Sequence, residues 1–265
     1  MTEPGTGRIL AVANRKGGTA KTTTAVNLAA SLAERGRRVL LVDLDSQGHA
    51  GLGFGVRARP GEPTVHDLLR GTGVTDLGRA VRHTAVPNVD VLPADRGFSG
   101  PDGAVAPLGL AAALKPLATD YAVILIDTAP TADALLISAL ASAHHVLVPT
   151  QLSHLAVDGV GQFARAFFRV ATSLNPGLRG LSIVPVQVDL RITMQREALE
   201  QLTSRFGRER LLAGIRTDIA PADAFGCGRP VRYVKPRARA VQDFELLCDH
   251  VMEKCIAGQI GTIKT

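Results

Sequence analysis

The stretch that decides the fold runs from Val12 to Ala29 and reads VANRKGGTAKTTTAVNLA. It joins a strand that ends at Ala13 to a helix that opens with Lys21, through a turn that contains Gly17 and Gly18. The backbone N–H groups of such a turn and of the helix start carry partial positive charge, and glycines let the main chain approach an anion. The stretch therefore predicts a phosphate-binding loop between a strand and a helix.

This loop contains two lysines, Lys16 and Lys21. Lys21 is placed to reach the β- and γ-phosphates of a nucleotide, and the Thr22 hydroxyl is placed to ligate Mg²⁺. The general pattern G-x-x-x-x-G-K-[ST] is not met literally, because Arg15 and Ala20 stand where its glycines would be. That pattern also gives no role to Lys16, at the front of the loop.

Outward from the loop, short apolar runs alternate with helical patterns. Strands are expected at 8–13, 38–43, 89–94, 121–127, 144–150 and 181–188, and helices at 21–35, 105–118, 131–142, 155–174, 193–206 and 238–257. The nearly continuous hydrophobicity of the strands indicates burial on both faces. We therefore expect an α/β fold with a mostly parallel twisted sheet and helices on both faces, in one domain over residues 8–258. Residues 1–7 are expected to be a disordered tail, and residues 259–265 a C-terminal tail.

Composition narrows the class of protein. Apolar residues make up 46% of the chain, which argues against disorder, and the apolar runs are too short to cross a bilayer. The opening MTEPGTG lacks the pattern of a leader, so a cytoplasmic protein is expected. Three cysteines match neither a zinc site nor a disulfide framework, and buried thiols are expected. A net charge of +6 favours polyanionic partners, and the absence of Trp favours duplex phosphates over unpaired bases.

Residues Lys16–Thr23 form K-G-G-x-x-K-T-T, a deviant Walker A box. With this box the chain resembles the ParA/MinD family of P-loop ATPases, and most of all the Soj-like ParA partition and positioning ATPases. Four further stretches resemble family blocks in the same order: VLLVDLDSQGHAGLGFG (39–55), ILIDTAPTADALLISAL (124–140), VPTQLSHLAVDGVGQF (148–163) and IRTDIAPADAFGCGRPV (215–231). The resemblance implies a P-loop ATPase of weak basal activity, with ATP and Mg²⁺ as cofactors.

The resemblance also implies roles for site residues. Lys16 reaches the ATP of a partner subunit across a dimer interface, and Asp45 positions or activates the attacking water. Asp127 holds Mg²⁺ through water together with Thr22 and Asp45, whereas Asp43 either assists there or is structural. The phosphates lie on Lys16, Gly17, Gly18, Thr19, Ala20, Lys21, Thr22 and Thr23, and the adenine packs on Pro236.

Two residues depart from the family pattern. Ala20 stands in place of a glycine, which is harmless only if its φ is negative, and Ser46 stands in place of a proline. Both substitutions bear on the turnover rate.

A basic run near the C-terminus suggests a nucleic-acid surface. Between Arg229 and Arg239 lie five basic residues and no acid: Arg229, Arg232, Lys235, Arg237 and Arg239. Such a run is also typical of a solvated surface. The resemblance implies non-specific binding of double-stranded DNA, and we expect it at Arg191, Arg237 and Arg239. It further implies an ATP-bound homodimer on the nucleoid, released when a ParB-like protein or a cargo adaptor stimulates hydrolysis.

The sequence leaves other functions open. The same cycle could position a protein cargo, such as a carboxysome or a chemoreceptor cluster, instead of a plasmid or chromosome. A MinD-like membrane switch needs a basic amphipathic tail, which CIAGQIGTIKT does not provide, so no membrane partner is expected. An iron–sulfur reductase needs cysteines between the second box and the segment after Asp127, and an amidotransferase-type synthetase needs a further catalytic domain.

Overall fold

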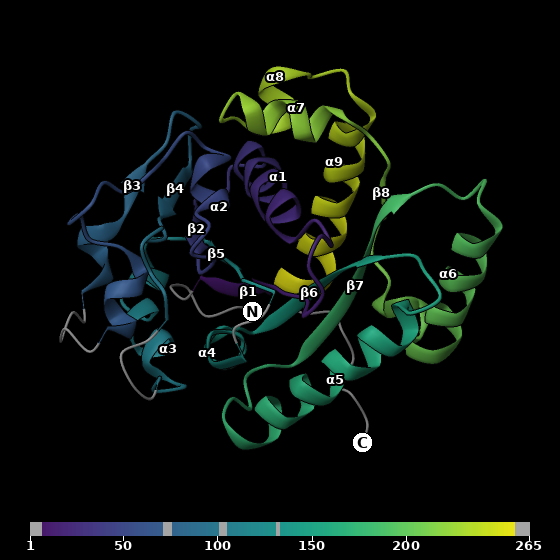
Figure 1. The fold of residues 1–265 in the computed structure, drawn as a ribbon, viewed down its shortest axis with the longest axis horizontal. Helices are drawn as coiled ribbons and strands as arrows, with labels where there is room; N and C mark the ends of the chain where they lie inside the picture. Colours follow the sequence, from purple (N-terminus) through teal and green to yellow (C-terminus); the bar gives the residue numbers. More distant parts are fainter. Residues whose placement is uncertain (1–6, 71–75, 101–104, 131–132, 258–265) are drawn as a thin grey trace.

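The computed structural model describes residues 7–70, 76–100, 105–130 and 133–257. Its centre is an eight-stranded sheet in the order β3-β4-β2-β5-β1-β6-β7-β8 (Figure 1). The strands are β1 (Arg8–Val12), β2 (Val39–Asp43), β3 (Arg82–His83), β4 (Val89–Leu92), β5 (Val123–Asp127), β6 (His145–Gln151), β7 (Gly180–Val188) and β8 (Ile215–Arg216). All neighbouring pairs are parallel except β3 and β4. The α/β fold expected from the apolar runs is therefore confirmed.

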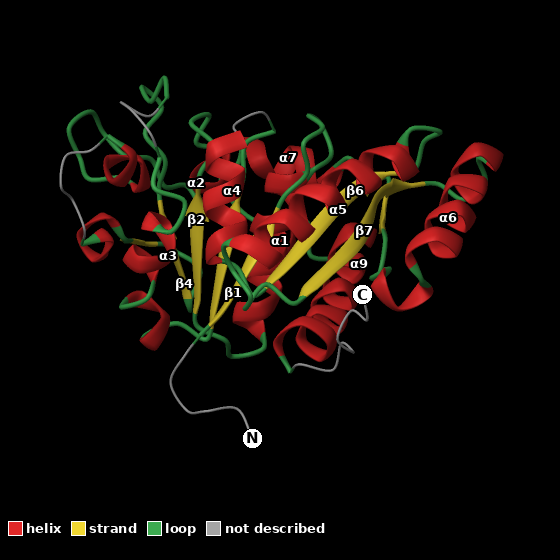
Figure 2. Cartoon of the chain, turned by 90° about the horizontal axis from the view of Figure 1, so that it is seen from below, coloured by secondary structure: helices red, strands yellow, loops and turns green. Residues whose placement is uncertain are grey.

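Helices cover both faces of the sheet (Figure 2). They are α1 (Lys21–Glu34), α2 (His49–Leu52), α3 (Gly109–Leu114), α4 (Asp133–Ser142), α5 (Ala156–Ser173), α6 (Thr193–Phe206), α7 (Ala220–Gly226), α8 (Val231–Val234) and α9 (Arg239–Val251). One core cluster joins α1, α7, α8 and α9 to one face, and a second joins α3, α4, α5 and α6 to the other. Alternate residues of one strand enter different clusters, as for Leu10 and Ala11 of β1, which explains the unbroken apolar runs.

The expected elements differ from the observed ones mainly at their ends. All six expected strands are present, whereas the edge strands β3 and β8 are two residues long and too short to give an apolar pattern. The helix expected over 105–118 is shorter, since α3 ends at Leu114 and Pro116 then introduces a 3₁₀ turn at Leu117–Thr119. Proline has no N–H to continue the helical hydrogen bonds.

The C-terminal helix packs as expected. Val241, Phe244, Leu247, Cys248 and Val251 of α9 are buried against the sheet, and the helix continues as a π-helical turn, Met252–Ile256. The expectation that all three cysteines are buried is wrong: Cys248 and Cys255 are buried, whereas Cys227 is exposed at the end of α7, because no core cluster covers that turn.

The described chain begins inside the packed domain. Gly7 is buried and its N–H donates to Ala118 O at 2.6 Å. Residues 1–6 and 259–265 of the expected tails, and Gly258 at the expected end of the domain, lie outside the described residues. So do Thr131 and Ala132, where a helix was expected to start. Within the described part of the chain, no helix is both long and apolar enough for a membrane span.

Candidate nucleotide-binding site

The loop between β1 and α1 lies at the carboxyl edge of the sheet and is fastened to β6. The Asn14 amide donates to Pro149 O at 2.8 Å, and its oxygen accepts the Lys16 N–H at 3.1 Å. The Gln151 amide donates to Gly18 O at 3.1 Å, where φ is +70°. These contacts fix the loop before any ligand arrives. Neither Asn14 nor Gln151 was expected as a site residue, because only the fold brings β6 to the loop.

The two lysines of the loop occupy opposite environments. Lys21 is buried, and its Nζ donates to Lys16 O at 3.2 Å across the loop. Burial lowers the pKa of Lys21, while the carboxylates of Asp127 and Asp45 act to raise it. Lys16 itself is exposed, although its backbone is held by Asn14 and by the Thr19 hydroxyl, which donates to Lys16 O at 3.2 Å. Lys21 therefore faces the inside of the loop, and the Lys16 side chain is open to solvent.

The loop enters α1 through a strained residue. Ala20, at the N-cap of α1, has φ 56° and ψ 30°, in the left-handed region. The condition for a harmless alanine here, a negative φ, is therefore not met, and the conformation costs on the order of 1 kcal/mol. Ala20 provides no side-chain cap for α1, so the backbone N–H groups of the first turn, at Lys21, Thr22 and Thr23, are not bound by a capping side chain.

Two carboxylates lie side by side at the ends of β2 and β5. Asp43 and Asp127 are partners in the strand register, and both are fully buried. Asp43 accepts the N–H groups of Asp45 at 3.2 Å and Gly51 at 3.0 Å, and burial raises its pKa to about 7. Both of its oxygens are thus engaged by the backbone after β2. This geometry favours the structural role of Asp43 over a role at the metal.

Asp127 has the features expected of a metal ligand. Among the described residues neither of its oxygens has a well-formed hydrogen bond. Burial, and then the Asp43 carboxylate, raise its pKa well above the usual range, while the nearby Thr22 hydroxyl and Lys21 act to lower it. A buried carboxylate with no partner is costly unless a cation or donor joins it.

A magnesium ion fits this place. Asp45 is partly exposed, its Oδ1 accepts the Gln47 N–H at 3.0 Å, and its charge acts on both Lys21 and Asp127. No cluster of three or more acidic, histidine or cysteine ligands occurs among the described residues. Magnesium does not need one, since it is usually held by one or two carboxylates with waters and phosphate oxygens.

His66, which sequence reasoning missed, holds the backbone between the end of β2 and Asp45. The His66 ring is buried, accepts the Asp95 N–H at Nδ1 (3.0 Å) and donates from Nε2 to Leu44 O (3.3 Å). Its ring stacks on Phe98 at 4.1 Å, and burial lowers its pKa. Neutral His66 thus ties the residue before Asp45 to the loop after β4.

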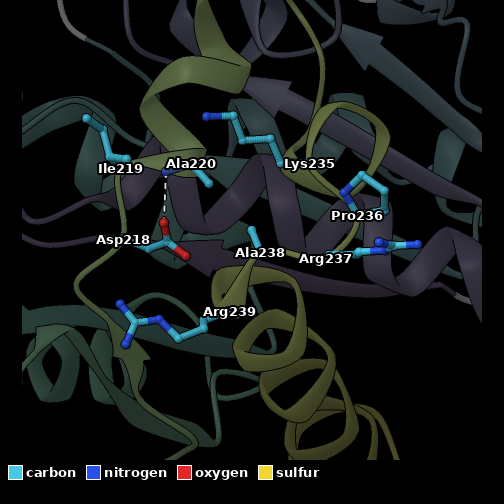
Figure 3. Close-up of a pocket in the computed structure, with 8 residues that line it drawn as sticks. All are labelled: Asp218, Ile219, Ala220, Lys235, Pro236, Arg237, Ala238 and Arg239. Atoms are coloured by element: carbon cyan, nitrogen blue, oxygen red, sulfur yellow. Dashed lines mark hydrogen bonds between the residues drawn. The ribbon is translucent and has the colours of Figure 1, made fainter.

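An open hollow of about 510 Å³ lies where α7 and α9 begin (Figure 3). Asp218 accepts the N–H of Ala220 at 2.9 Å and that of Ala240 at 3.1 Å, so one carboxylate caps both helix starts. Pro236, the residue expected to pack on adenine, lies on the wall of this hollow with Arg237 and Arg239. Asp218 was not expected, although an acid shortly before a helix start is an ordinary capping signal.

The expected DNA-binding residues Arg191, Arg237 and Arg239 differ in their surroundings. Arg191 is exposed and makes a bidentate pair with Asp189, at 2.8 and 2.6 Å. The pKa of Asp189 is lowered to about 2, by Arg191 first and to a lesser degree by Arg239, which places Arg239 in the same neighbourhood. In Figure 3 the Arg237 and Arg239 side chains extend in opposite directions.

Two members of the basic run, Arg232 and Lys235, are engaged in ion pairs and are not available to bind DNA phosphates. Arg232 contacts Glu34 and Glu245, each at 3.6 Å, and Lys235 pairs with Asp223. The run has no acid within it, but acids from α1, α7 and α9 reach it in the fold. This is why the sequence alone overstated its free charge.

Comparison with known proteins identifies the family. A family model described as an AAA domain matches residues 7–180. The chromosome-partitioning ATPase Soj of Thermus thermophilus is 36% identical over 249 residues, covering 93% of this chain and 96% of that protein. The chain belongs to the ParA/Soj family of P-loop ATPases. ParA of Caulobacter vibrioides is 34% identical over 254 residues, covering 93% of this chain and 94% of that protein.

Solved structures similar to this ParA/Soj chain include a cell division ATPase and a protein named as a synthase. The cell division ATPase MinD of Pyrococcus furiosus matches with TM-score 0.76 and 28% identity, covering 93% of this chain and 99% of that chain. A structure named cobyrinic acid a,c-diamide synthase, from Mycobacterium smegmatis with bound ADP and magnesium, matches with TM-score 0.76 and 31% identity, covering 98% and 100%. The chain is accordingly an ATPase, and ATP and Mg²⁺ are its cofactors.

Proposed function

We propose that this chain runs a partition cycle in which an ATP-bound homodimer binds double-stranded DNA without sequence preference. A ParB-like protein or cargo adaptor then stimulates hydrolysis, and the subunits leave the nucleoid. The cycle would segregate a plasmid or chromosome. The Soj and ParA relatives, named for chromosome partitioning, support this cargo over a protein assembly.

One observation carries the proposal: the Lys16 side chain is exposed on a loop whose backbone is fixed. Lys21 already supplies a cation inside the loop. A second cation held at the rim, and open to solvent, is suited to meet the phosphates of a facing subunit. Lys16 would then offset charge on the partner's triphosphate, and ATP would join the subunits. Loss of the γ-phosphate would loosen the dimer.

The other loop residues act within one subunit. Gly17, Gly18 and Thr19 to Thr23 present backbone N–H groups to the phosphates, and Lys21 turns its Nζ from Lys16 O to the β- and γ-oxygens. Thr22, Asp45 and Asp127 hold Mg²⁺, which when bound supplies positive charge to the phosphate oxygens. Asp45, the most exposed of the carboxylates here, orients the attacking water, and Pro236 packs on adenine.

Binding of DNA would use the exposed arginines. Arg191 and Arg239 share the surface around Asp189, and a dimer doubles every phosphate contact. This doubling makes DNA affinity depend on dimerisation and hence on ATP. Localisation at the nucleoid in the cytoplasm follows from the same contacts.

The test is Lys16→Ala, with Lys115→Ala as a control that removes an exposed lysine on α3's C-terminal side. Sedimentation velocity with Mg²⁺ and a non-hydrolysable ATP analogue should show dimers for the parent and the control. Lys16→Ala should bind the analogue and stay monomeric. A Lys16→Ala variant that dimerises like the parent would overturn the role of Lys16 in trans.

A second experiment separates the partition cycle from amide synthesis. ATP hydrolysis should rise with duplex DNA plus partner protein and should not depend on glutamine or ammonia. Hydrolysis that requires an amide donor would favour a synthetase, as the name of the Mycobacterium structure suggests for that protein.

A further inference from the structure

Two adjoining hollows on the α4 and α5 side of the sheet take no part in the proposed nucleotide or DNA contacts. The helices cover the same face of the sheet (Figure 2), and the hollows measure about 270 and 390 Å³. They share Arg15 and Arg169 in their walls, so they form one continuous feature. We refer to it as the α4–α5 groove.

The floor of the α4–α5 groove is apolar and comes from both helices. It consists of Leu136, Ile137 and Leu140 of α4, Ala166 and Val170 of α5, and Leu174 just after α5. Ile137 remains 36% exposed, and Ala166 and Leu174 are partly exposed. Apolar side chains left open in a groove indicate a surface that a partner can cover.

The rim of the groove is basic. Arg165 and Arg169 lie one helical turn apart on α5 and are exposed, and Arg15 extends the rim from the phosphate loop. No acidic residue lines either hollow. Within the described ranges no ion pair occupies Arg165 or Arg169. Both guanidinium groups can therefore receive carboxylates from another molecule.

We propose that the α4–α5 groove is the docking surface for an acidic segment of a partner protein. Carboxylates of the segment pair with Arg165 and Arg169, and an aliphatic or aromatic side chain covers the exposed part of the floor at Ile137. A nucleic-acid duplex would use the arginines and leave the apolar floor open, which is why the combination favours a peptide.

The proposal goes beyond the proposed function and does not depend on it. Arg15 lines both hollows and is next to Lys16 in the chain. A segment seated in the groove thus touches the phosphate loop directly, beside the residue proposed to act in trans. A partner that docks here would carry an acidic, apolar stretch.

The probe is a synthetic fluorescein-labelled peptide of about 14 residues, with leucines at helical spacing flanked by glutamates. Its binding to the full chain without nucleotide is followed by fluorescence anisotropy at about 0.15 M salt, where exposed charges are partly screened. The test variant is Arg165→Ala/Arg169→Ala. The matched control, Arg37→Ala/Arg179→Ala, removes two exposed arginines away from the groove. Circular dichroism checks that both variants are folded.

We expect the test variant to bind about tenfold more weakly or worse, and the control to stay within about twofold of the parent. A peptide with alanines in place of the leucines should lose about tenfold as well, because the floor contributes to binding. Equal binding by both variants would overturn the proposal, since the attraction would then be one of net charge.

Two further outcomes would also overturn it. If the test variant loses affinity for a duplex that displaces the peptide, the groove is a DNA surface. If it loses ATP-dependent dimerisation, the groove is covered by a second copy of the chain. Peptide affinity is measured without nucleotide, and dimerisation and DNA binding of the parent are measured separately. Failure of the partition cycle is therefore distinguishable from failure of the docking surface.

Discussion

Ala20 holds a left-handed backbone at the junction between the phosphate loop and α1. For a residue with a Cβ this conformation costs on the order of 1 kcal/mol, and glycine adopts it freely. The strain persists because the loop is fastened on both sides, through Asn14 and Gln151 to β6 and through Lys21 in the first turn of α1.

The first prediction is that Ala20→Gly raises the free energy of unfolding by about 0.5–1 kcal/mol, because the strain is relieved at a small cost in chain entropy. Urea denaturation measures the change. Ala29→Gly, in the regular interior of α1, is the control and should lower stability by about 1 kcal/mol or more. A loss of stability for Ala20→Gly would contradict the assigned strain.

A second prediction at the scale of single residues concerns Asp189, which binds Arg191 in a bidentate pair. Asp189→Asn should release the Arg191 guanidinium and strengthen binding of the ATP-bound chain to a DNA duplex by about three- to tenfold at low salt. Anisotropy titrations over a range of salt concentrations measure this. Asp76→Asn makes the same charge change at an exposed pair with Arg79 and should have a much smaller effect. An equal gain in both variants would mean that only net charge matters.

At the scale of elements, the β6–β7 pairing depends on a glycine. Gly180 lies opposite His145 in the register, and a Cβ at Gly180 would come within 2.0 Å of the His145 ring. That ring is buried and contacts the Ser182 hydroxyl at 2.9 Å, so it has no room to move.

Gly180→Ala should therefore lower the free energy of unfolding by about 2–4 kcal/mol through overpacking. Gly159→Ala in α5 is the control, because its Cβ would meet nothing within 4 Å and alanine favours a helix. Thermal or urea unfolding of both variants tests the contrast. Equal stability of Gly180→Ala and the parent would show that His145 can move aside.

For the whole molecule, histidines in the interior lower stability at acid pH. Burial lowers the pKa of His145 from 6.5 to about 4, and also lowers the pKa values of His66 and His144. Between pH 6.5 and 4 the unfolded chain takes up a proton at position 145 and the folded chain does not. Stability is therefore lost as the pH falls through this window, by about 3 kcal/mol from His145.

His145→Gln should flatten this decline between pH 6.5 and 4, because glutamine does not titrate. Unfolding free energies in urea at several pH values measure the slope, and each variant is compared with its own value at pH 7.5. His154→Gln, at an exposed position, should leave the slope unchanged. A parent-like slope in His145→Gln would mean that other groups control acid unfolding.

How much of this protein could be predicted from its sequence depends on the range of the interactions involved. Local patterns specify the strand–turn–helix order, the double-sided burial of the strands, and the positions of Lys21 at a helix start and Asp127 at a strand end. An apolar run and a glycine turn act over a few residues, so their outcome is decided before distant parts of the chain meet.

Only the tertiary structure decided the features that join distant segments. The left-handed Ala20, the engagement of both Asp43 oxygens, and the double cap by Asp218 each require a neighbouring element in place. The same is true of the ion pairs that occupy Arg232 and Lys235. Their acidic partners come from helices that a local pattern cannot bring to the basic run. Which charges stay free for a ligand is therefore a property of the packed fold, because burial and pairing are set by neighbours far away in the sequence.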